Sequence, residues 1–286
     1  MAPHTIEQAL RKGNNIPLPH YDSPAGNQKV SELGATTGKY PAPAVAIELK
    51  ASEWTDIGDE VLLDINQALQ AGQQLTPRLD EQYINEKEKS MAHTNEADVV
   101  RAAAIHLLHP VHQALDLCPT VNKSIMVRSE VQQNKMRTDI SYYKIINGTP
   151  TPMAIIEFKK RGVFYYDQFK KAFKTVAAGA TNPPAPTSNE KNVWKAAVAN
   201  KKHKTLFEDN ALKGMKQISA YAVDRHTKYC ALFDYDALVL VRFDDYSRGK
   251  TDVGTYCSLT YIPYTAHSHE MRSALLGFLM EAWAHT

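Results

Sequence analysis

The sequence predicts an α/β protein in which helices flank a central mixed β-sheet. From residue 94 onward, segments with apolar residues at steps of three and four alternate with short runs rich in β-branched and aromatic residues. Three of these strand-like runs are consecutive, which is typical of antiparallel pairing, and two more come after intervening helical segments. That order is typical of a sheet whose faces are covered by helices.

Composition restricts the class of protein further. The 286 residues are enough for one large domain, and 43% hydrophobic with 22% charged residues is ordinary for a soluble globular chain. The apolar runs are too short to span a membrane, and the first residues lack the apolar stretch of a secretory signal. The three cysteines show no CxxC spacing, so we expect reduced thiols in an intracellular protein of the cytoplasm or nucleus.

The chain is expected to divide near residue 90. Residues 1–90 are predicted to form an irregular and helical segment, with a strand over 45–49 and a helix over 57–71. Because residues 76–90 are polar and highly charged, we place the boundary there and assign 91–286 to one domain.

The second region has a definite order of elements. A helix begins at residue 94 and should kink or break at Pro110. Asn147-Gly148 predicts a hairpin, although Pro150 and Pro152 suggest a loop longer than two residues. We expect strands over 124–131, 136–146 and 152–159, helices over 163–177 and 206–224, a Pro-rich loop over 179–192, strands over 229–233 and 238–243, and a last helix over 269–284.

Three residues in adjacent strands carry candidate chemistry. Glu157 and Lys159 end a strand that is apolar on both faces, and their spacing of two directs them to one side of the sheet. Asp139, on the preceding strand, should lie within about a residue of the position opposite Glu157. Two carboxylates this close repel one another unless a cation lies between them, and oxygen ligands favour Mg²⁺ or Mn²⁺. Lys159 would then orient an attacking water or stabilise charge on a phosphate.

An aspartate on one strand of a hairpin followed by Glu157-Phe158-Lys159 at the end of the next resembles the PD-(D/E)XK nuclease superfamily, although Thr138 stands where the motif has proline. The resemblance covers residues 94–243 and implies a restriction-endonuclease-like core. It implies a metal site formed by Asp139, Glu157, the backbone carbonyl of Phe158 and Glu96, with Glu96 near the start of the preceding helix. A solvated first-turn acid favoured by the helix dipole is an equally good explanation of Glu96.

The resemblance also implies a helix with the pattern Q-x-x-x-Y that helps to hold DNA. Gln217 and Tyr221 match it, and their spacing of four puts both side chains on one helix face. Residues 159–204 contain eleven Lys and Arg against two acidic residues, whereas residues 53–96 are acidic. This basic block, with Lys160 and Arg161 nearest the motif, suits a polyanionic substrate, although a solvated lysine-rich face is an equally good explanation of the block alone.

Other candidates are weaker. Glu48 and Lys50 form a second E-x-K without a hairpin partner, and Glu130 could face the site or only line a sheet edge. Three histidines spaced three apart lack the further ligands of a zinc site: His106, His109 and His112. The expected function is a metal-dependent nuclease that cuts DNA in preference to RNA with little sequence specificity. The alternative is a catalytically inactive module on the same fold that binds nucleic acid or protein.

Overall fold

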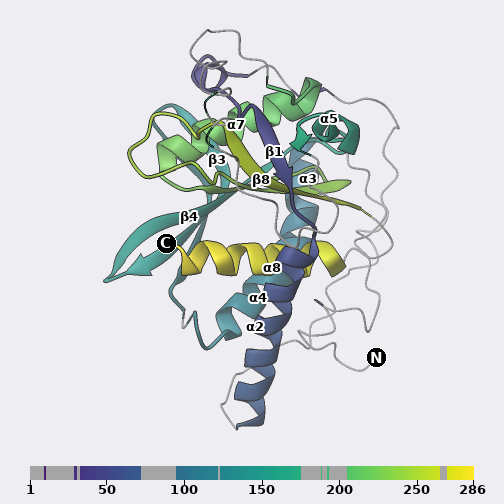
Figure 1. Ribbon diagram of the computed structural model, residues 1–286. Helices are drawn as coiled ribbons and strands as arrows, with labels where there is room; N and C mark the ends of the chain where they lie inside the picture. The colour runs from purple at the N-terminus through teal and green to yellow at the C-terminus, as the bar shows by residue number, and fades with distance from the viewer. Residues whose placement is uncertain are drawn as a thin grey trace.

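The computed structural model describes residues 10, 29–30, 33–71, 95–121, 123–174, 188, 192, 205–264 and 269–286. Within these residues the chain forms one mixed sheet of eight strands in the order β2-β3-β4-β6-β7-β8-β1-β5, with helices on both faces (Figure 1). The α/β class and the mixed sheet are confirmed.

The strands are β1 (Val45–Glu48), β2 (Ile125–Gln133), β3 (Met136–Ile146), β4 (Thr149–Phe158), β5 (Phe173–Lys174), β6 (Tyr229–Phe233), β7 (Ala237–Arg242) and β8 (Tyr256–Pro263). The helices are the 3₁₀ turn η2 (Thr37–Lys39), α2 (Ser52–Gln70), α3 (Glu96–Ala103), the π-helical η4 (Ala104–Leu108), α4 (His109–Leu117), α5 (Tyr166–Lys170), α7 (Asp209–Arg225) and α8 (His269–Ala284).

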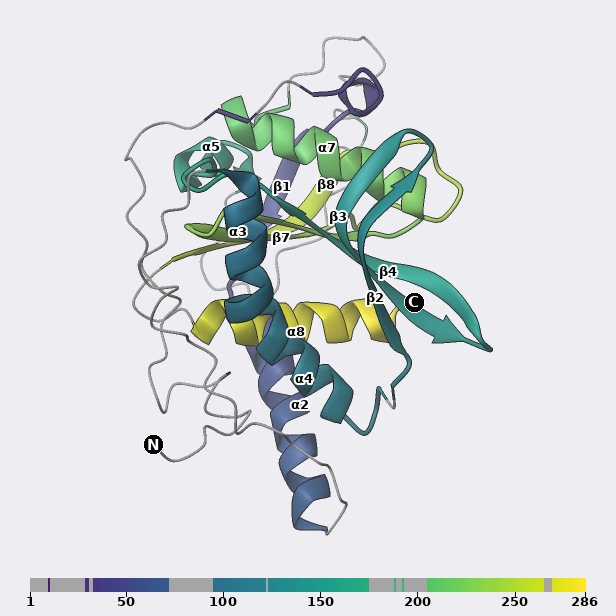
Figure 2. The same ribbon diagram turned by 180° about the vertical axis from the view of Figure 1, so that it is seen from behind.

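The core lies in two layers, one on each face of the sheet. Alternate residues of the central strands point to opposite faces, so that Ile156 and Phe158 of β4 join the layer under α2, α3, α4 and α8. Ile155 joins the other layer, which α7 and α5 cover. Figures 1 and 2 show the two groups of helices on either side of the sheet. Glu157 has the parity of Ile155, so its side chain emerges on the α7 face.

Residues before position 90 belong to the same sheet as those after it. β1 pairs in parallel with β8 on one side and with β5 on the other. Trp54 of α2 donates from Nε1 to the hydroxyl of Thr260 on β8 at 2.7 Å and packs edge-on against Phe278 of α8. The expected boundary over 76–90 lies outside the described residues, but the sheet does not divide at residue 90.

The β3–β4 connection is a two-residue turn, so the expectation of a longer loop was wrong. Ile146 pairs directly with Thr149, and Asn147 and Gly148 both have positive φ, 51° and 76°. This is the backbone that tight hairpins require. Pro150 and Pro152 are tolerated because the pairing of β4 with β6 begins only at Ala154, so the other edge of β4 carries no ladder there.

The helix predicted from residue 94 is interrupted, as expected near Pro110. Its π-helical segment Ala104–Leu108 ends where the N–H of His109 donates to the carbonyl of Ala104, five residues back. Pro110, near the start of α4, has no N–H to donate to the carbonyl of His106 four residues back, and that carbonyl accepts from Arg272 Nε at 2.7 Å instead. The wider turn therefore accommodates the proline without ending the helix.

Two other elements differ from the prediction. The helix expected over 163–177 is only α5, because the chain turns after Lys170 and pairs as β5 beside β1. β8 was missed because one of its faces carries Ser258 and Thr260 where apolar residues would be expected. Both are buried with hydrogen bonds, Ser258 donating to Asp244 at 2.6 Å and Thr260 accepting from Trp54.

Two remaining expectations concern other parts of the chain. All three cysteines are buried as free thiols. The loop predicted over 179–192 and most of the basic block lie outside the described residues.

No helix in the described ranges is both long and apolar enough to cross a bilayer.

Candidate active site

The β3–β4 register brings Asp139 beside Glu157. Ile140 pairs with Ile156, so the next position along each strand sets the two carboxylates opposite one another. Asp139 Oδ2 accepts a hydrogen bond from the backbone N–H of Phe158 at 2.8 Å, which fixes the aspartate against β4. The predicted juxtaposition of these two acids is confirmed.

Glu157 and Lys159 form a buried ion pair at the carboxyl end of β4. Glu157 is 3% exposed and Lys159 is 5% exposed. Lys159 Nζ lies 2.5 Å from Glu157 Oε1 and 2.9 Å from the carbonyl oxygen of Phe158. The second carboxylate oxygen, Glu157 Oε2, is buried and has no hydrogen-bond partner among the residues that the structure describes. One oxygen of this carboxylate is therefore left over for a ligand.

Burial and neighbouring charge act in opposite directions on this pair. Burial raises the pKa of Glu157 to about 8, against the opposing effect of the Lys159 ammonium. Burial alone would lower the pKa of Lys159, but the carboxylates of Glu157 and Glu96 outweigh it and raise that pKa. The arrangement therefore favours a charged lysine and carries excess negative charge that an additional cation would stabilise.

Glu96 reaches the same group of side chains from the other face of the sheet. It is the first residue of α3, which begins with a reciprocal capping box between Asn95 and Asp98. Glu96 Oε2 lies 3.7 Å from Lys159 Nζ, and its side chain is 36% exposed. The predicted approach of Glu96 to the site is confirmed as an ion pair with the lysine.

Gln217 and Tyr221 fix Glu157 from α7. Gln217 Nε2 donates to Glu157 Oε1 at 2.5 Å and to the hydroxyl of Tyr221 at 2.7 Å. Burial raises the pKa of Tyr221, with a further contribution from the charge of Glu157. The two residues lie on one helix face as predicted, but in this structure Gln217 contacts the carboxylate and Tyr221 contacts Gln217.

Lys160 and Arg161, which follow the motif, lie in different environments. Lys160 is exposed, as a substrate contact would need. The Arg161 side chain is 9% exposed, donates from Nε to Asp236 Oδ1 at 2.8 Å and has its guanidinium 5.8 Å from the ring centroid of Tyr235. Arg161 therefore holds the loop after β4 in place rather than presenting its charge to a substrate.

Two residues near the site were not predicted. Asp234, at the end of β6, accepts four backbone N–H bonds between 2.6 and 3.1 Å, two of them from Val163 and Phe164 in the loop after Lys159. Arg137 lies two residues before Asp139 on the same face, has a 60% exposed side chain and acts electrostatically on Tyr221. The signal available in the sequence for Asp234 was its position directly between two apolar strand-like runs, where an acid is expected to be buried.

The weaker candidates do not join this site. The carboxylate of Glu48 accepts a hydrogen bond from the Tyr166 hydroxyl at 2.7 Å, four strands from β4. Glu130 is exposed on the edge strand β2 and lies 4.0 Å from Arg137. Among the three histidines, His106 is buried whereas His109 is exposed, and His112 Nε2 is 2.8 Å from the hydroxyl of Tyr142.

The oxygen donors at the end of β4 suit a hard divalent cation. Within the described ranges, no group of three or more His, Cys, Asp and Glu residues is arranged to hold a metal ion. The expected set of three carboxylates is therefore not assembled. The free oxygen of Glu157, the adjacent Asp139 and the carbonyl of Phe158 remain, and Mg²⁺ typically takes one or two carboxylates and keeps several waters. These three groups suit such an ion.

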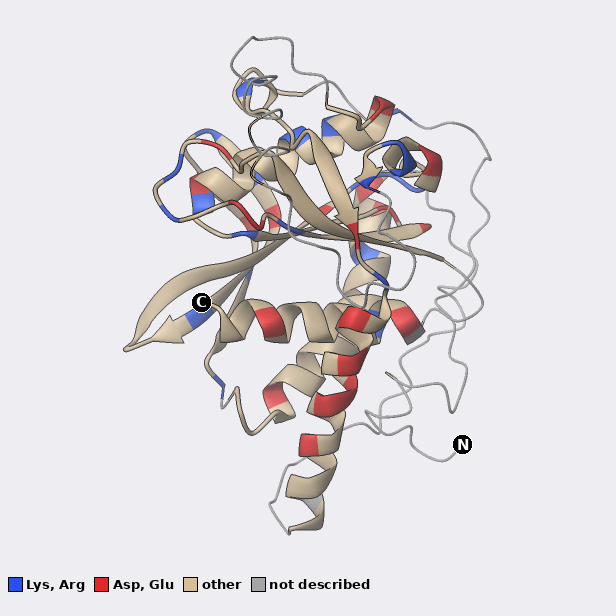
Figure 3. Ribbon diagram, viewed as in Figure 1, with Lys and Arg blue, Asp and Glu red and all other residues tan. Residues whose placement is uncertain are grey.

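Charge near the site is uneven. Acidic side chains recur along α2 (Figure 3), whereas the exposed Lys160 and Arg137 are close in sequence to Lys159 and Asp139. A comparison with known proteins found no matching family model, no matching curated protein and no matching solved structure.

Proposed function

We propose that this protein is a metal-dependent nuclease that hydrolyses phosphodiester bonds, in DNA in preference to RNA and with little sequence specificity. One observation carries the proposal. A lysine ammonium is buried between two carboxylates, while one oxygen of the buried Glu157 has no partner in the described part of the chain. Asp139 lies opposite on the neighbouring strand.

Stability does not explain this arrangement. A buried carboxylate is costly unless every oxygen is satisfied, and a buried ion pair is often no more stable than apolar side chains of similar volume. Ionisable groups with strongly shifted pKa values concentrate at functional sites. The combination of acid, acid and lysine at the end of a central strand is suited to a reaction in which charge develops on a phosphate.

Each side chain has a role in the proposed reaction. A bound Mg²⁺ or Mn²⁺ ion, held by Asp139, Glu157 and the Phe158 carbonyl, would supply a Lewis acid for the phosphate. Lys159 stabilises negative charge on the phosphate and orients the attacking water. Gln217 keeps the Glu157 carboxylate in position through its 2.5 Å hydrogen bond.

The surroundings of the site support a polyanionic substrate. Arg137 and Lys160 are exposed, lie within two residues of Asp139 and Lys159 in the chain, and can contact phosphates. Contacts to phosphates carry no sequence information, so a site that holds its substrate in this way would cut with little sequence specificity.

The test is cleavage of labelled single-stranded and duplex DNA, and of RNA, in Mg²⁺, Mn²⁺ or EDTA. We expect cleavage that EDTA abolishes and that Asp139→Ala and Glu157→Ala each reduce by at least about 10³-fold, because each removes a group that stabilises the transition state. Asp64→Ala is the control, since this acid is exposed on α2 and has no role at the site. Full activity of either site variant would disprove the assignment.

The same assay separates the nuclease from a binding module that lacks catalysis. Salt-sensitive binding of DNA with no cleavage in either metal would support the binding module instead.

A further inference from the structure

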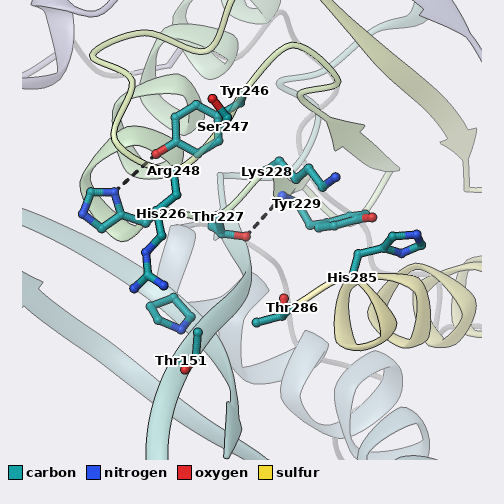
Figure 4. Close-up of a pocket in the computed structure, with 11 residues that line it drawn as sticks. Thr151, His226, Thr227, Lys228, Tyr229, Tyr246, Ser247, Arg248, His285 and Thr286 are labelled. Atoms are coloured by element: carbon teal, nitrogen blue, oxygen red, sulfur yellow. Dashed lines mark hydrogen bonds between the residues drawn. The ribbon is translucent and has the colours of Figure 1, made fainter. Parts of the chain in front are cut away.

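A second group of polar side chains surrounds a pocket of about 320 Å³ at the other end of the sheet. Its lining comes from four segments: the start of β4, the turn between α7 and β6, the chain after β7, and the residues after α8 (Figure 4). From Thr151 in the pocket to Phe158 at the candidate active site, β4 rises about 23 Å at roughly 3.3 Å per residue. The pocket is therefore separate from that site.

The lining is basic. It includes the cations of Lys228 and Arg248 and the imidazoles of His226 and His285, and no acidic side chain contributes to it. Hydroxyls of Thr, Ser and Tyr provide further hydrogen-bond donors. Glu281, on α8 before the pocket residue His285, accepts hydrogen bonds from Tyr229 and Arg242. A concave surface with two cations and many donors is complementary to an oxyanion.

The pocket is fixed by its own hydrogen bonds. Thr227 donates to the carbonyl of Met153 and accepts from the N–H of Tyr229 at 3.2 Å, which joins the turn to β4 and β6. His226 ends α7 in the left-handed conformation, with φ 58° and ψ 39°, where glycine is the usual residue. Its Nδ1 lies 3.4 Å from the hydroxyl of Tyr246. An imidazole is thus held at the pocket edge at a position that costs about 1 kcal/mol relative to glycine.

We propose that this pocket binds a phosphate monoester. Its volume is at the lower end of the range for small-molecule sites, which suits a compact phosphorylated ligand rather than a length of polymer. The phosphate is carried either by a free small molecule or by the 5′ end of an oligonucleotide. This proposal does not depend on nuclease activity.

A structural explanation of the same cations makes a different prediction. Helices α7 and α8 both end beside the pocket, and basic residues are favourable near helix C-termini. If that were their role, substituting Lys228 would lower thermal stability and the pocket would not bind phosphate.

The experiment is isothermal titration calorimetry of the full chain in EDTA with inorganic phosphate, a nucleoside 5′-monophosphate and the unphosphorylated nucleoside. We expect the two phosphates to bind and the nucleoside not to bind. Arg248→Gln and Lys228→Gln should each weaken binding at least about tenfold, because each removes a charged donor. Arg128→Gln is the control, since Arg128 is exposed on β2 and lies outside the pocket.

Two oligonucleotides separate the sources of the phosphate. Tighter binding of a 5′-phosphorylated tetramer than of its 5′-hydroxyl counterpart, lost in Arg248→Gln, would identify a nucleic-acid end. Binding of the free phosphates alone would identify a small molecule. Either result would support phosphate binding in the pocket. Absence of phosphate binding, or equal affinity in the wild type, Arg248→Gln and Lys228→Gln, would overturn it. Arg248 is exposed, so its substitution tests the proposal even if Lys228→Gln does not fold.

Discussion

Lys159 and Lys50 show how much the neighbours of a residue determine its chemistry. Both follow a glutamate by two positions at the end of an apolar strand. Lys159 is buried and contacts Glu157, Glu96 and the carbonyl of Phe158. Lys50 is exposed. The same E-x-K pattern therefore occurs in two different environments, and only the contacts with neighbouring elements distinguish them.

We predict that substitution separates the two lysines. Lys159→Ala should lower kcat for DNA cleavage by about two to four orders of magnitude, the usual range for losing a positioned acid–base or charge-stabilising group. Lys50→Ala, the matched control, should leave the rate nearly unchanged. Single-turnover kinetics with both variants provides the measurement. If Lys50 proved essential and Lys159 dispensable, the active site would have to be placed at the end of β1.

His112 should make the fold sensitive to acid. Burial lowers its pKa from 6.5 to about 4, and His109 adds to the effect. The unfolded chain then binds a proton more readily, so the stability that neutral His112 contributes is present above about pH 6.5 and is lost as the pH falls toward 4. We expect the free energy of unfolding to fall by about 3 kcal/mol across this window from His112 alone.

Urea unfolding at several pH values tests the effect of His112. The His112→Gln variant should lose this part of the pH dependence, because glutamine does not titrate. Tyr142→Phe removes the hydroxyl that contacts His112 but leaves the histidine buried, so the dependence should persist. An unchanged pH profile in His112→Gln would show that other groups cause the loss.

At the scale of elements, the crossing of α2 and α8 depends on two glycines. A Cβ at Gly277 would lie 1.8 Å from the carbonyl oxygen of Trp54, and one at Gly58 would lie 2.4 Å from that of Ser273. The backbones of the two helices therefore approach more closely than any side chain allows. α8 can be apolar around almost its whole circumference because α2, α4 and the sheet together enclose it.

Gly277→Ala should accordingly destabilise the protein by about 3 kcal/mol or more, because relieving the clash requires the two helices to separate. Thermal or urea unfolding measures the change. Gly38→Ala is a suitable control: its Cβ would meet only an ordinary contact at 3.7 Å, and we expect little change there. Equal stability of the two variants would mean that α2 and α8 do not pack this closely.

For the whole molecule, the N-terminal region is part of the sheet. β1 fills the position between β8 and β5, and α2 covers part of α8. Removing β1 would expose an edge of β8, and removing α2 would expose apolar side chains of α8, including Phe278.

A chain consisting of residues 91–286 should therefore be much less stable than the full chain, or fail to fold. Circular dichroism and thermal unfolding of the fragment, compared with the full chain, give the answer. A fragment with cooperative unfolding and unchanged stability would restore a domain boundary near residue 90.

Glu96, Gln217 and Tyr221 were expected at the site only through the resemblance to a nuclease superfamily. The sequence alone determined the class of fold, most of the elements after residue 94, and the group formed by Asp139, Glu157 and Lys159. These predictions depend on local information, because side-chain period and turn residues reveal strands and helices, and a hairpin fixes which residues of adjacent strands meet. The length of the β3–β4 turn was not predictable in this way. A two-residue turn places Pro150 in β4, which is tolerated only because β6 does not pair with that part of β4.

Only the tertiary structure placed β1 in the sheet, revealed β8 and showed that Arg161 forms an ion pair with Asp236. Each of these depends on contacts between segments far apart in the chain. Ser258 and Thr260 are tolerated in a buried strand because Asp244 and Trp54 satisfy them. Arg161 was expected to contact substrate, yet a carboxylate 75 residues away pairs with it. Local sequence cannot specify such partners, because burial is decided by which distant segments come together.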